Sequence, residues 1–244
     1  MSIIVFQHGP DVGPGRLGLT LRDHGLALDI RRLDLSGERP VGPGAVPPDF
    51  DGVDGVVSLG GEQNVGEPHP WMDAECDFLR RAHQRQLPVL GICLGSQLLA
   101  HALGGRVTKM PAPEWGFHTI SINPTGQTDP ILSGIAWDAP HFCAHEYEVA
   151  ELPRDAVVLA SSRLCRVQAW RAGVRTYAVQ FHPECDRATI ERWAQASEAA
   201  RRAGLTPADV GGQCDAHYAT FARLADRLCV NLASYLFRPV ACRA

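Results

Sequence analysis

The chain has 244 residues, and its 23 basic and 27 acidic side chains give a formal net charge of −4 at pH 7. Its 45% of hydrophobic and 20% of charged residues are typical of a folded globular protein and exclude a disordered one. The balanced charge argues against a nucleic-acid binder, and no run reaches the ~18 apolar residues of a membrane span, so we expect neither nucleic acid nor a membrane as a partner.

In the first half of the chain, short apolar runs alternate with helical patterns, which predicts an α/β domain with a mostly parallel or mixed sheet. Strands are expected over 3–6, 26–33, 54–59 and 88–92, with loops over 9–18 and 41–48. Helices are expected over 71–86 and 96–103. The apolar stripe of the first helix consists of Met72, Cys76, Leu79 and Ala82. Glu75 is assigned to a polar face of that helix.

The second half of the chain is richer in predicted strands, which are expected over 117–122, 157–161, 166–170 and 174–181. Helices are expected over 187–203 and 216–237. The glycine-containing stretch 204–212 is a weak boundary, which divides the chain into a domain over 1–203 and a helical extension over 204–244. The extension has a continuous apolar stripe that must be covered. We expect it to pack on the protein's own sheet; a surface for a synthetase or for a second copy of the chain is the alternative.

A candidate nucleophile, Cys93, lies in the segment Gly91-Ile92-Cys93-Leu94-Gly95, between a predicted strand and a predicted helix. The pattern glycine-x-nucleophile-x-glycine marks a strained turn in which larger side chains would collide. Such a turn exposes the thiol at the carboxyl end of a strand, where the dipole of the following helix favours the thiolate. The backbone amide of Leu94 then faces an oxyanion formed at Cys93.

A candidate general base, His182, stands in the segment Val179-Gln180-Phe181-His182-Pro183-Glu184 at the end of a predicted strand. Residues i and i+2 of an extended segment point to the same side, so the Glu184 carboxylate can reach the His182 ring. A carboxylate in this place fixes the tautomer of the imidazole and stabilises its charged form. The two segments together predict a nucleophile–base–orienter triad.

A glycine pair, Gly60-Gly61, directly follows the strand predicted over 54–59. Adjacent glycines let backbone amides approach a developing negative charge closely. This loop is therefore the candidate for a second oxyanion donor.

These segments resemble the triad (class I) glutamine amidotransferases, most closely the amidotransferase domain of GMP synthases and its free-standing relatives. The resemblance extends over about residues 3–193 and rests on Gly60-Gly61, the block 88–97 (PVLGICLGSQ) with Leu98-Leu99-Ala100, Gly116-Phe117 and the segment 179–184. It implies a flavodoxin-like α/β fold with a mostly parallel central sheet flanked by helices. It also implies that Cys93, His182 and Glu184 are the catalytic triad.

Further site residues follow from the same resemblance. It assigns the oxyanion amides to Gly61 and Leu94, and the substrate-binding positions to Gly60, Gln97 and His145. This chain has Gly60-Gly61-Glu62-Gln63 where relatives often have Gly-Gly-Pro-Met. The implied reaction is hydrolysis of the glutamine γ-amide through a cysteinyl thioester, releasing glutamate and ammonia.

Three functions remain open at this point. The first is an amidotransferase or glutaminase whose ammonia serves a separate synthetase, since the chain has no Walker loop and no dinucleotide fingerprint. The second is a γ-glutamyl peptidase or amide hydrolase with the same triad, and the third is a binding module with an idle triad. An α/β-hydrolase is rejected because in that fold the acid precedes the histidine.

No cofactor is expected, and no metal, because His141, His145 and Glu146 lack a third ligand at suitable spacing. The eight cysteines are widely spaced without a CxxC pair, which is typical of reduced thiols. The N-terminus lacks the basic start and apolar core of a signal peptide. We therefore expect a cytoplasmic protein.

Overall fold

The computed structural model describes residues 2–35 and 45–238, so the stretch 41–44 of the loop expected over 41–48 lies outside the described residues. The strands are β1 (Ser2–Gln7), β2 (Leu28–Arg32), β3 (Val53–Ser58), β4 (Val89–Ile92), β5 (Arg106–Ile122), β6 (Asp138–Glu151), β7 (Ala156–Ser161), β8 (Ala169–Ala172) and β9 (Thr176–Val179). The helices are α1 (Gly15–Asp23), α2 (Met72–Gln84), α3 (Leu94–Ala102), α4 (Pro124–Gln127), α5 (Arg187–Ala196), α6 (Glu198–Arg202) and α7 (Pro207–Asn231). The described residues also include a 3₁₀ turn, η2 (Pro130–Leu132), and a π-helical turn, η3 (Leu232–Leu236).

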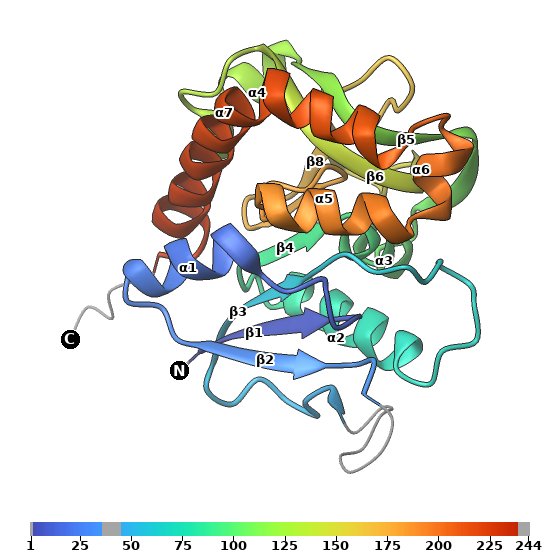
Figure 1. The fold of residues 1–244 in the computed structure, drawn as a ribbon. Helices are drawn as coiled ribbons and strands as arrows, with labels where there is room; N and C mark the ends of the chain where they lie inside the picture. The colour runs from blue at the N-terminus through green and yellow to red at the C-terminus, as the bar shows by residue number, and fades with distance from the viewer. Residues whose placement is uncertain (1, 36–44, 239–244) are drawn as a thin grey trace.

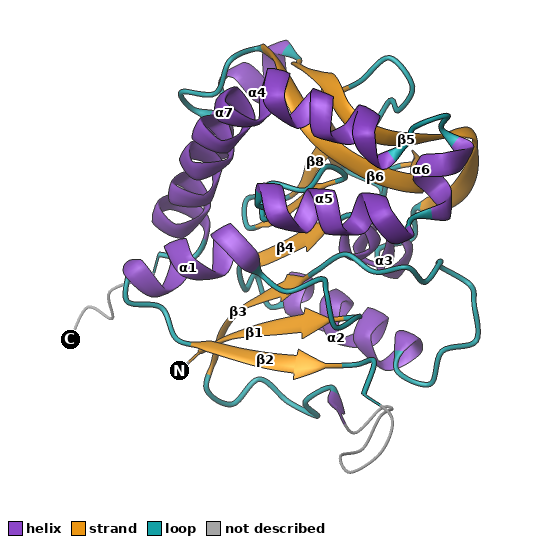
Figure 2. Ribbon diagram, in the orientation of Figure 1, coloured by secondary structure: helices purple, strands orange, loops and turns teal. Residues whose placement is uncertain are grey.

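The described strands form one mixed sheet in the order β2-β1-β3-β4-β9-β8-β7-β5-β6 (Figures 1 and 2). The pairs β2–β1, β1–β3, β3–β4 and β4–β9 are parallel, and the remaining pairs are antiparallel. Because parallel strands end at the same edge, the segments after β1, β3, β4 and β9 meet there. Ligands of open α/β sheets bind outside this edge.

Helices cover both faces of the parallel half of the sheet (Figure 1). On one face, Leu17 and Leu21 of α1 and Leu228 of α7 share a core cluster with β1, β3 and β4. On the other face, side chains of α2 and α3 such as Phe78 and Leu98 form a second cluster. A third cluster lies between α5, α6, α7 and the hairpin β5–β6. The sheet is therefore buried on both sides, as the continuous apolar strands predict.

The C-terminal helix α7 packs on the protein's own core. Thr206 begins it with a capping box, in which the Thr206 and Asp209 side chains each accept a backbone amide of the other residue. Its apolar stripe is buried at Phe221, Leu224 and Leu228, whereas Tyr235 in η3 is 62% exposed. Of the two outcomes considered for the stripe, the structure shows packing on the chain itself. The division of the chain at residue 203 stays a prediction.

Several elements differ from those expected. Helix α1 occupies part of the predicted loop 9–18, because Gly15 and Gly18 conceal a helix whose buried residues include Leu17 and Leu21. Gly15 has a φ of 41°, and a Cβ there would collide with the Glu184 carbonyl oxygen. The helix expected over 187–203 is divided into α5 and α6 at Ser197, whose extended backbone lets its side chain cap α6.

The antiparallel hairpin was also incompletely predicted. Strand β6 had no counterpart, and β5 begins at Arg106 rather than at residue 117. The predicted strand 166–170 corresponds to β8, which begins at Ala169. None of the helices in the described part of the chain is long and apolar enough to cross a membrane.

Candidate active site

Cys93 lies in the sharp turn that the flanking glycines predict, between β4 and α3. Its backbone has a φ of 53° and a ψ of −108°, a conformation that costs energy in a non-glycine residue. A Cβ at Gly91 would lie 2.6 Å from the Gly95 carbonyl oxygen, and one at Gly95 would collide with the Ser58 carbonyl. Both glycines are therefore required by close backbone packing.

The Cys93 thiol is covered rather than exposed. Only 5% of the residue is accessible, which corrects the expectation of an exposed thiol. The cause is strand β6, whose Ala144 carbonyl lies 3.9 Å from the Cys93 Sγ and accepts its weak hydrogen bond. The site therefore has little direct access from solvent in this conformation.

His182 and Glu184 form a buried pair at the end of β9. His182 Nδ1 donates to Glu184 Oε1 over 2.7 Å, and the residues are 2% and 4% exposed. The His182 Nε2 is buried and has no hydrogen-bond partner among the described residues. The ring is held by the edge-on Trp193 ring, with centroids 5.1 Å apart.

The charge on Glu184 decides how the imidazole titrates. Burial opposes the charged ring, but the Glu184 carboxylate and Cys93 outweigh burial and raise the pKa of His182 well above its usual value. An imidazole that is anchored at one nitrogen and open at the other can accept and return a proton at Nε2.

The glycine pair after β3 lies against these residues. A Cβ at Gly60 would be 3.0 Å from His182 Cε1 and 3.6 Å from Cys93 Cβ. A Cβ at Gly61 would be 2.8 Å from Leu94 Cδ2. The backbone amides of Gly61 and Leu94 donate to no backbone carbonyl among the described residues. Two unpaired amides beside a candidate nucleophile can bind an oxyanion.

The predicted substrate-binding side chains Gln97 and His145 meet at one backbone carbonyl. Gln97 Nε2 donates to the Tyr147 carbonyl over 3.0 Å and to Gln180 Oε1 over 3.2 Å. His145 Nδ1 donates to the same carbonyl over 3.0 Å, and its Nε2 contacts Glu114 Oε2 at 3.0 Å. Their role in substrate binding stays a prediction.

A second group of Cys, His and Glu side chains lies in the hairpin β5–β6. The ligand atoms of Glu114, Cys143 and His145 are within 4.8 Å of one another. The Glu114 carboxylate also accepts from Ser162 Oγ over 2.6 Å and from Gln168 Nε2 over 2.5 Å. Burial first, and then the nearby Glu114 charge, raises the pKa of Cys143 well above its usual value. The hydrogen bonds satisfy the polar atoms of Glu114 and His145, and the raised pKa keeps the Cys143 thiol protonated.

Sequence reasoning missed a third buried group, which consists of His8, Ser58 and Glu75. Glu75 is 0% exposed, so its assignment to a polar face was wrong. The available signal was its spacing: Met72, Glu75, Leu79 and Ala82 follow one another at intervals of three and four and share one helix face. A polar residue on an apolar stripe predicts a buried partner. His8 could have been found as a polar residue that follows an apolar strand at its carboxyl end.

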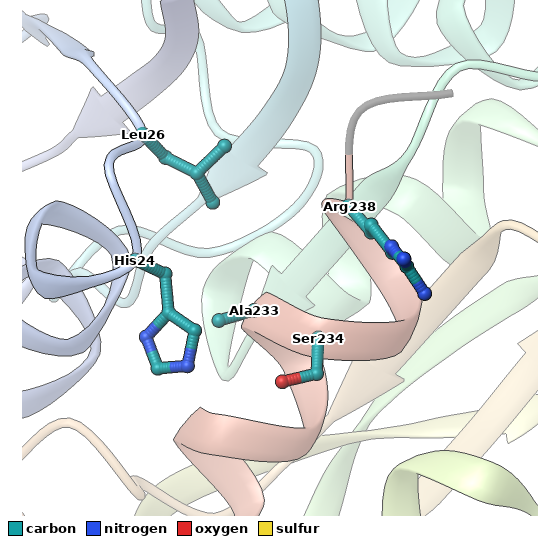
Figure 3. A pocket seen from close by; sticks show the side chains of 5 residues that line it. All are labelled: His24, Leu26, Ala233, Ser234 and Arg238. Carbon is teal, nitrogen blue, oxygen red and sulfur yellow. The ribbon is translucent and has the colours of Figure 1, made fainter. Parts of the chain in front are cut away.

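A pocket of about 290 Å³ lies elsewhere, between the end of α1 and the C-terminal turns (Figure 3). It is lined by His24, Leu26, Ala233, Ser234 and Arg238. Leu26 precedes β2, so the pocket lies at the amino end of the parallel strands, whereas Cys93 lies at their carboxyl end. The pocket is therefore separate from the candidate active site.

Comparisons with known proteins agree on one family. The family model "Glutamine amidotransferase class-I" matches residues 20–192. A glutamine-hydrolyzing GMP synthase subunit of Thermoplasma volcanium is 33% identical over 173 residues, which are 70% of this chain and 78% of the relative. The protein of the same name from Sulfurisphaera tokodaii is 35% identical over 165 residues, which are 66% of this chain and 83% of the relative.

A solved structure extends the likeness to the whole chain. The crystal structure of a glutamine amidotransferase from Methylobacillus flagellatus is 25% identical, with a TM-score of 0.83, and covers 100% of this chain and 98% of its own. The shared part thus includes the C-terminal helix α7.

Proposed function

Because the chain belongs to the class I glutamine amidotransferase family, we propose that it hydrolyses the glutamine γ-amide through a thioester on Cys93. His182 and Glu184 complete the triad, the amides of Gly61 and Leu94 bind the oxyanion, and Gly60, Gln97 and His145 shape the substrate pocket. Residues 1–203 form the amidotransferase unit, and residues 204–244 are its helical extension.

The reaction proceeds in two halves. The Cys93 thiolate adds to the γ-carbonyl carbon, and the tetrahedral oxyanion lies between the Gly61 and Leu94 amides. The C–N bond then breaks as His182 Nε2 gives its proton to the amide nitrogen, which departs as ammonia and leaves a γ-glutamyl thioester. His182 next takes a proton from water, the resulting hydroxide attacks the thioester, and glutamate and the thiolate are released.

One observation carries this proposal: the buried Nε2 of His182 has no partner among the described residues, while Nδ1 is held by Glu184. The other Cys–His–Glu group does not offer this arrangement, because both nitrogens of His145 contact acceptors. Of these two histidines, His182 alone has a free position for proton transfer beside a strained cysteine.

The proposal is tested by Cys93→Ala, with Cys76→Ala as the matched control. Cys76 is half-buried, and burial raises its pKa to about 12, so its thiol stays protonated. We expect Cys93→Ala to abolish ammonia release from glutamine and Cys76→Ala to retain it. Substantial turnover by Cys93→Ala would overturn the assignment of the nucleophile.

A substrate panel identifies the leaving group. Glutamine and γ-glutamyl dipeptides are offered at equal concentration, and the thioester is trapped by rapid acid quenching and detected by intact mass. Faster turnover of glutamine supports the proposal; faster turnover of the dipeptides identifies a γ-glutamyl peptidase. Absence of a covalent adduct with all of them indicates a binding module.

We further propose that the ammonia serves a separate synthetase. The support is the similarity to proteins named as glutamine-hydrolyzing subunits of GMP synthase. Copurification of the chain with a synthetase from its own cells, and a rise in glutamine hydrolysis when the two are mixed, are the expected results. Hydrolysis at an unchanged rate in the presence of that synthetase contradicts the partnership.

A further inference from the structure

The buried group of His8, Ser58 and Glu75 lies directly beneath the glycine loop. His8 follows β1, Ser58 is the last residue of β3, and Glu75 belongs to α2. His8 Nε2 contacts Glu75 Oε2 at 2.8 Å, and Ser58 Oγ donates to Glu75 Oε1 over 2.7 Å. His8 Nδ1 lies 3.1 Å from the carbonyl oxygen of Gly60. The three residues of the group are at most 1% exposed.

The hydrogen-bond partners of His8 determine its charge. The Glu75 carboxylate and the Gly60 carbonyl are both acceptors, so both ring nitrogens of His8 must donate, and the imidazole is a cation. Burial opposes this charge, but the Glu75 carboxylate and the hydrogen bonds outweigh burial and raise the pKa of His8. The Trp71 ring covers the imidazole with centroids 4.8 Å apart. The pKa of the nearby Asp34 is lowered first by its hydrogen bond from Arg32 and to a smaller degree by His8.

The bond from His8 fixes one peptide plane. In a trans peptide the carbonyl of one residue and the amide of the next point in opposite directions. With the Gly60 carbonyl directed at His8, the Gly61 amide is directed away from it, and Gly60 itself lies against Cys93 and His182. The peptide thus presents its N–H, rather than its carbonyl, on the side away from His8.

This peptide would otherwise be free to turn. Two adjacent glycines have access to many backbone conformations, so the sequence of the loop does not select one of them. If the peptide turned, the Gly60 carbonyl oxygen would point away from His8 and toward the oxyanion. The carbonyl oxygen would then repel the oxyanion. Gln63 also anchors the loop, because its Nε2 donates to the His8 carbonyl over 3.1 Å. A charge-assisted hydrogen bond from His8 is the strongest of these restraints.

We propose that His8, held by Glu75, is a positioning residue that fixes the Gly60–Gly61 peptide so that the Gly61 amide faces the oxyanion. This inference rests on the proposed function, because it assigns the amide to the oxyanion of the same reaction. It adds two residues, His8 and Glu75, that do not touch the substrate but set the geometry of a group that does.

Two substitutions at position 8 separate positioning from structural support. The amide nitrogen of asparagine takes the place of the imidazole Nδ1, so His8→Asn keeps the donor to Gly60 and loses the contact with Glu75. The amide nitrogen of glutamine takes the place of Nε2, so His8→Gln keeps the donor to Glu75 and loses the one to Gly60. The two variants therefore divide the role of His8 between its two partners.

We expect the variant with the lower activity to be the more stable of the two. His8→Gln lowers kcat for glutamine about 10²–10³-fold, the usual effect of losing an oxyanion donor, whereas His8→Asn lowers it less than about tenfold. KM changes little in either variant. His8→Asn has the lower Tm, because Glu75 is left as an unpaired buried charge. A purely structural role gives the same order in both measurements, and that result would overturn the inference.

Alkylation of Cys93 by iodoacetamide provides a readout without an oxyanion. We expect its rate in His8→Gln to stay within about twofold of the wild-type rate while glutamine hydrolysis falls, since alkylation needs only the thiolate. An equal loss in both reactions means that the triad itself has moved and contradicts the inference. If His8→Asn does not fold, the same pair is compared in the Glu75→Gln background, which removes the buried charge from both.

A crystal structure of each variant keeps this inference distinct from the proposed function. We expect the Gly60 carbonyl to be turned in His8→Gln and to keep its direction in His8→Asn. An unturned peptide in His8→Gln overturns the inference whatever the substrate is. A turned peptide in a protein whose wild type hydrolyses no γ-glutamyl compound leaves the positioning intact and refutes the proposed function.

Discussion

The pair His182–Glu184 after β9 and the pair of His8, after β1, with Glu75 of α2 are chemically alike, but they differ at the second nitrogen of the imidazole. Both are buried, with distances of 2.7 and 2.8 Å between ring nitrogen and carboxylate. The second nitrogen of His8 donates to the Gly60 carbonyl, whereas that of His182 has no partner among the described residues. In both pairs a buried carboxylate raises the pKa of the imidazole. Of the two rings, His182 alone has a free second nitrogen, so it is the one that can carry a proton.

The pair His145–Glu114 resembles the pair His8–Glu75, because both ring nitrogens of its histidine have partners. Its two nitrogens contact the Tyr147 carbonyl and the Glu114 carboxylate, each at 3.0 Å. We therefore interpret the two closed pairs as fixing backbone carbonyls around the site, and the open pair as the one that takes part in chemistry.

The largest effect is expected from His182→Asn. Asparagine keeps a donor toward Glu184 but has no base in the place of Nε2, so kcat for glutamine should fall by about 10³-fold or more. Circular dichroism and Tm check that the fold persists. The control is His83→Gln on α2, a half-buried histidine that contacts Thr176 Oγ1 and lies outside the site. Retention of wild-type turnover by His182→Asn would break the comparison.

Glu184→Gln should have a smaller effect than His182→Asn. The amide oxygen of glutamine still accepts from Nδ1, so the ring keeps its orientation and loses only the stabilisation of its charge. We expect kcat to fall about 10²-fold, and the pH at which activity rises to shift down, because the carboxylate no longer raises the pKa of His182. Complete inactivation equal to that of His182→Asn, in a folded protein, contradicts this division of labour.

The parts of the molecule that the sequence predicts are those with local causes. The elbow needs only Gly91 and Gly95, and His182 and Glu184 are two positions apart, although they meet in a turn after β9 and not in the extended segment that was expected. The class I amidotransferase fold and the family are confirmed. The whole hairpin β5–β6 is different, because the register that pairs Glu114 with His145 joins residues 31 positions apart.

The closed pairs were missed for the same reason. His8 and Glu75 are 67 positions apart, and each alone is an ordinary polar residue beside an apolar run. Helix α1 was missed because glycines at both ends of its first turn hide its apolar spacing. The positive φ of Gly15 and its close packing against Glu184, neither of which is visible in the sequence, explain why residue 15 must be glycine.

The pair Glu114–His145 is expected to be worth more for stability than any surface ion pair. Glu114→Ala removes the acceptor of buried donors on His145, Ser162 and Gln168 and should lower the free energy of unfolding by about 3–5 kcal/mol, measured by denaturant titration. Burial opposes the Glu114 charge, but the hydrogen bonds from His145 and Ser162 outweigh it and lower the pKa of Glu114 below 4.5. Its contribution is therefore present above pH 4.5 and is lost as the pH falls through the lowered pKa. The control is the surface variant Glu151→Ala, which removes the exposed partner of Arg106. It should change the free energy of unfolding little. A loss in Glu114→Ala no larger than the control's refutes this ranking.

His141 sharpens the comparison as a buried histidine that has no carboxylate. Its Nδ1 has no hydrogen-bond partner in the described part of the chain, and its ring lies between Phe181 and Phe221. Burial alone lowers the pKa of His141 to about 4, so the ring is neutral at pH 7. The unfolded chain binds this proton near pH 6.5 and the folded chain only near pH 4, so the contribution of His141 to stability is present above pH 6.5 and is lost as the pH falls toward 4.

The variant His141→Phe removes the titrating group and keeps an aromatic ring in its place. His118, which lies opposite residue 141 in the sheet, is the same in both proteins. Between pH 7 and pH 5 we expect the wild type to lose about 2 kcal/mol more unfolding free energy than His141→Phe, measured by denaturant titration at both pH values. Equal losses in the two proteins would show that His141 is charged when folded, and that burial without a carboxylate does not keep an imidazole neutral here.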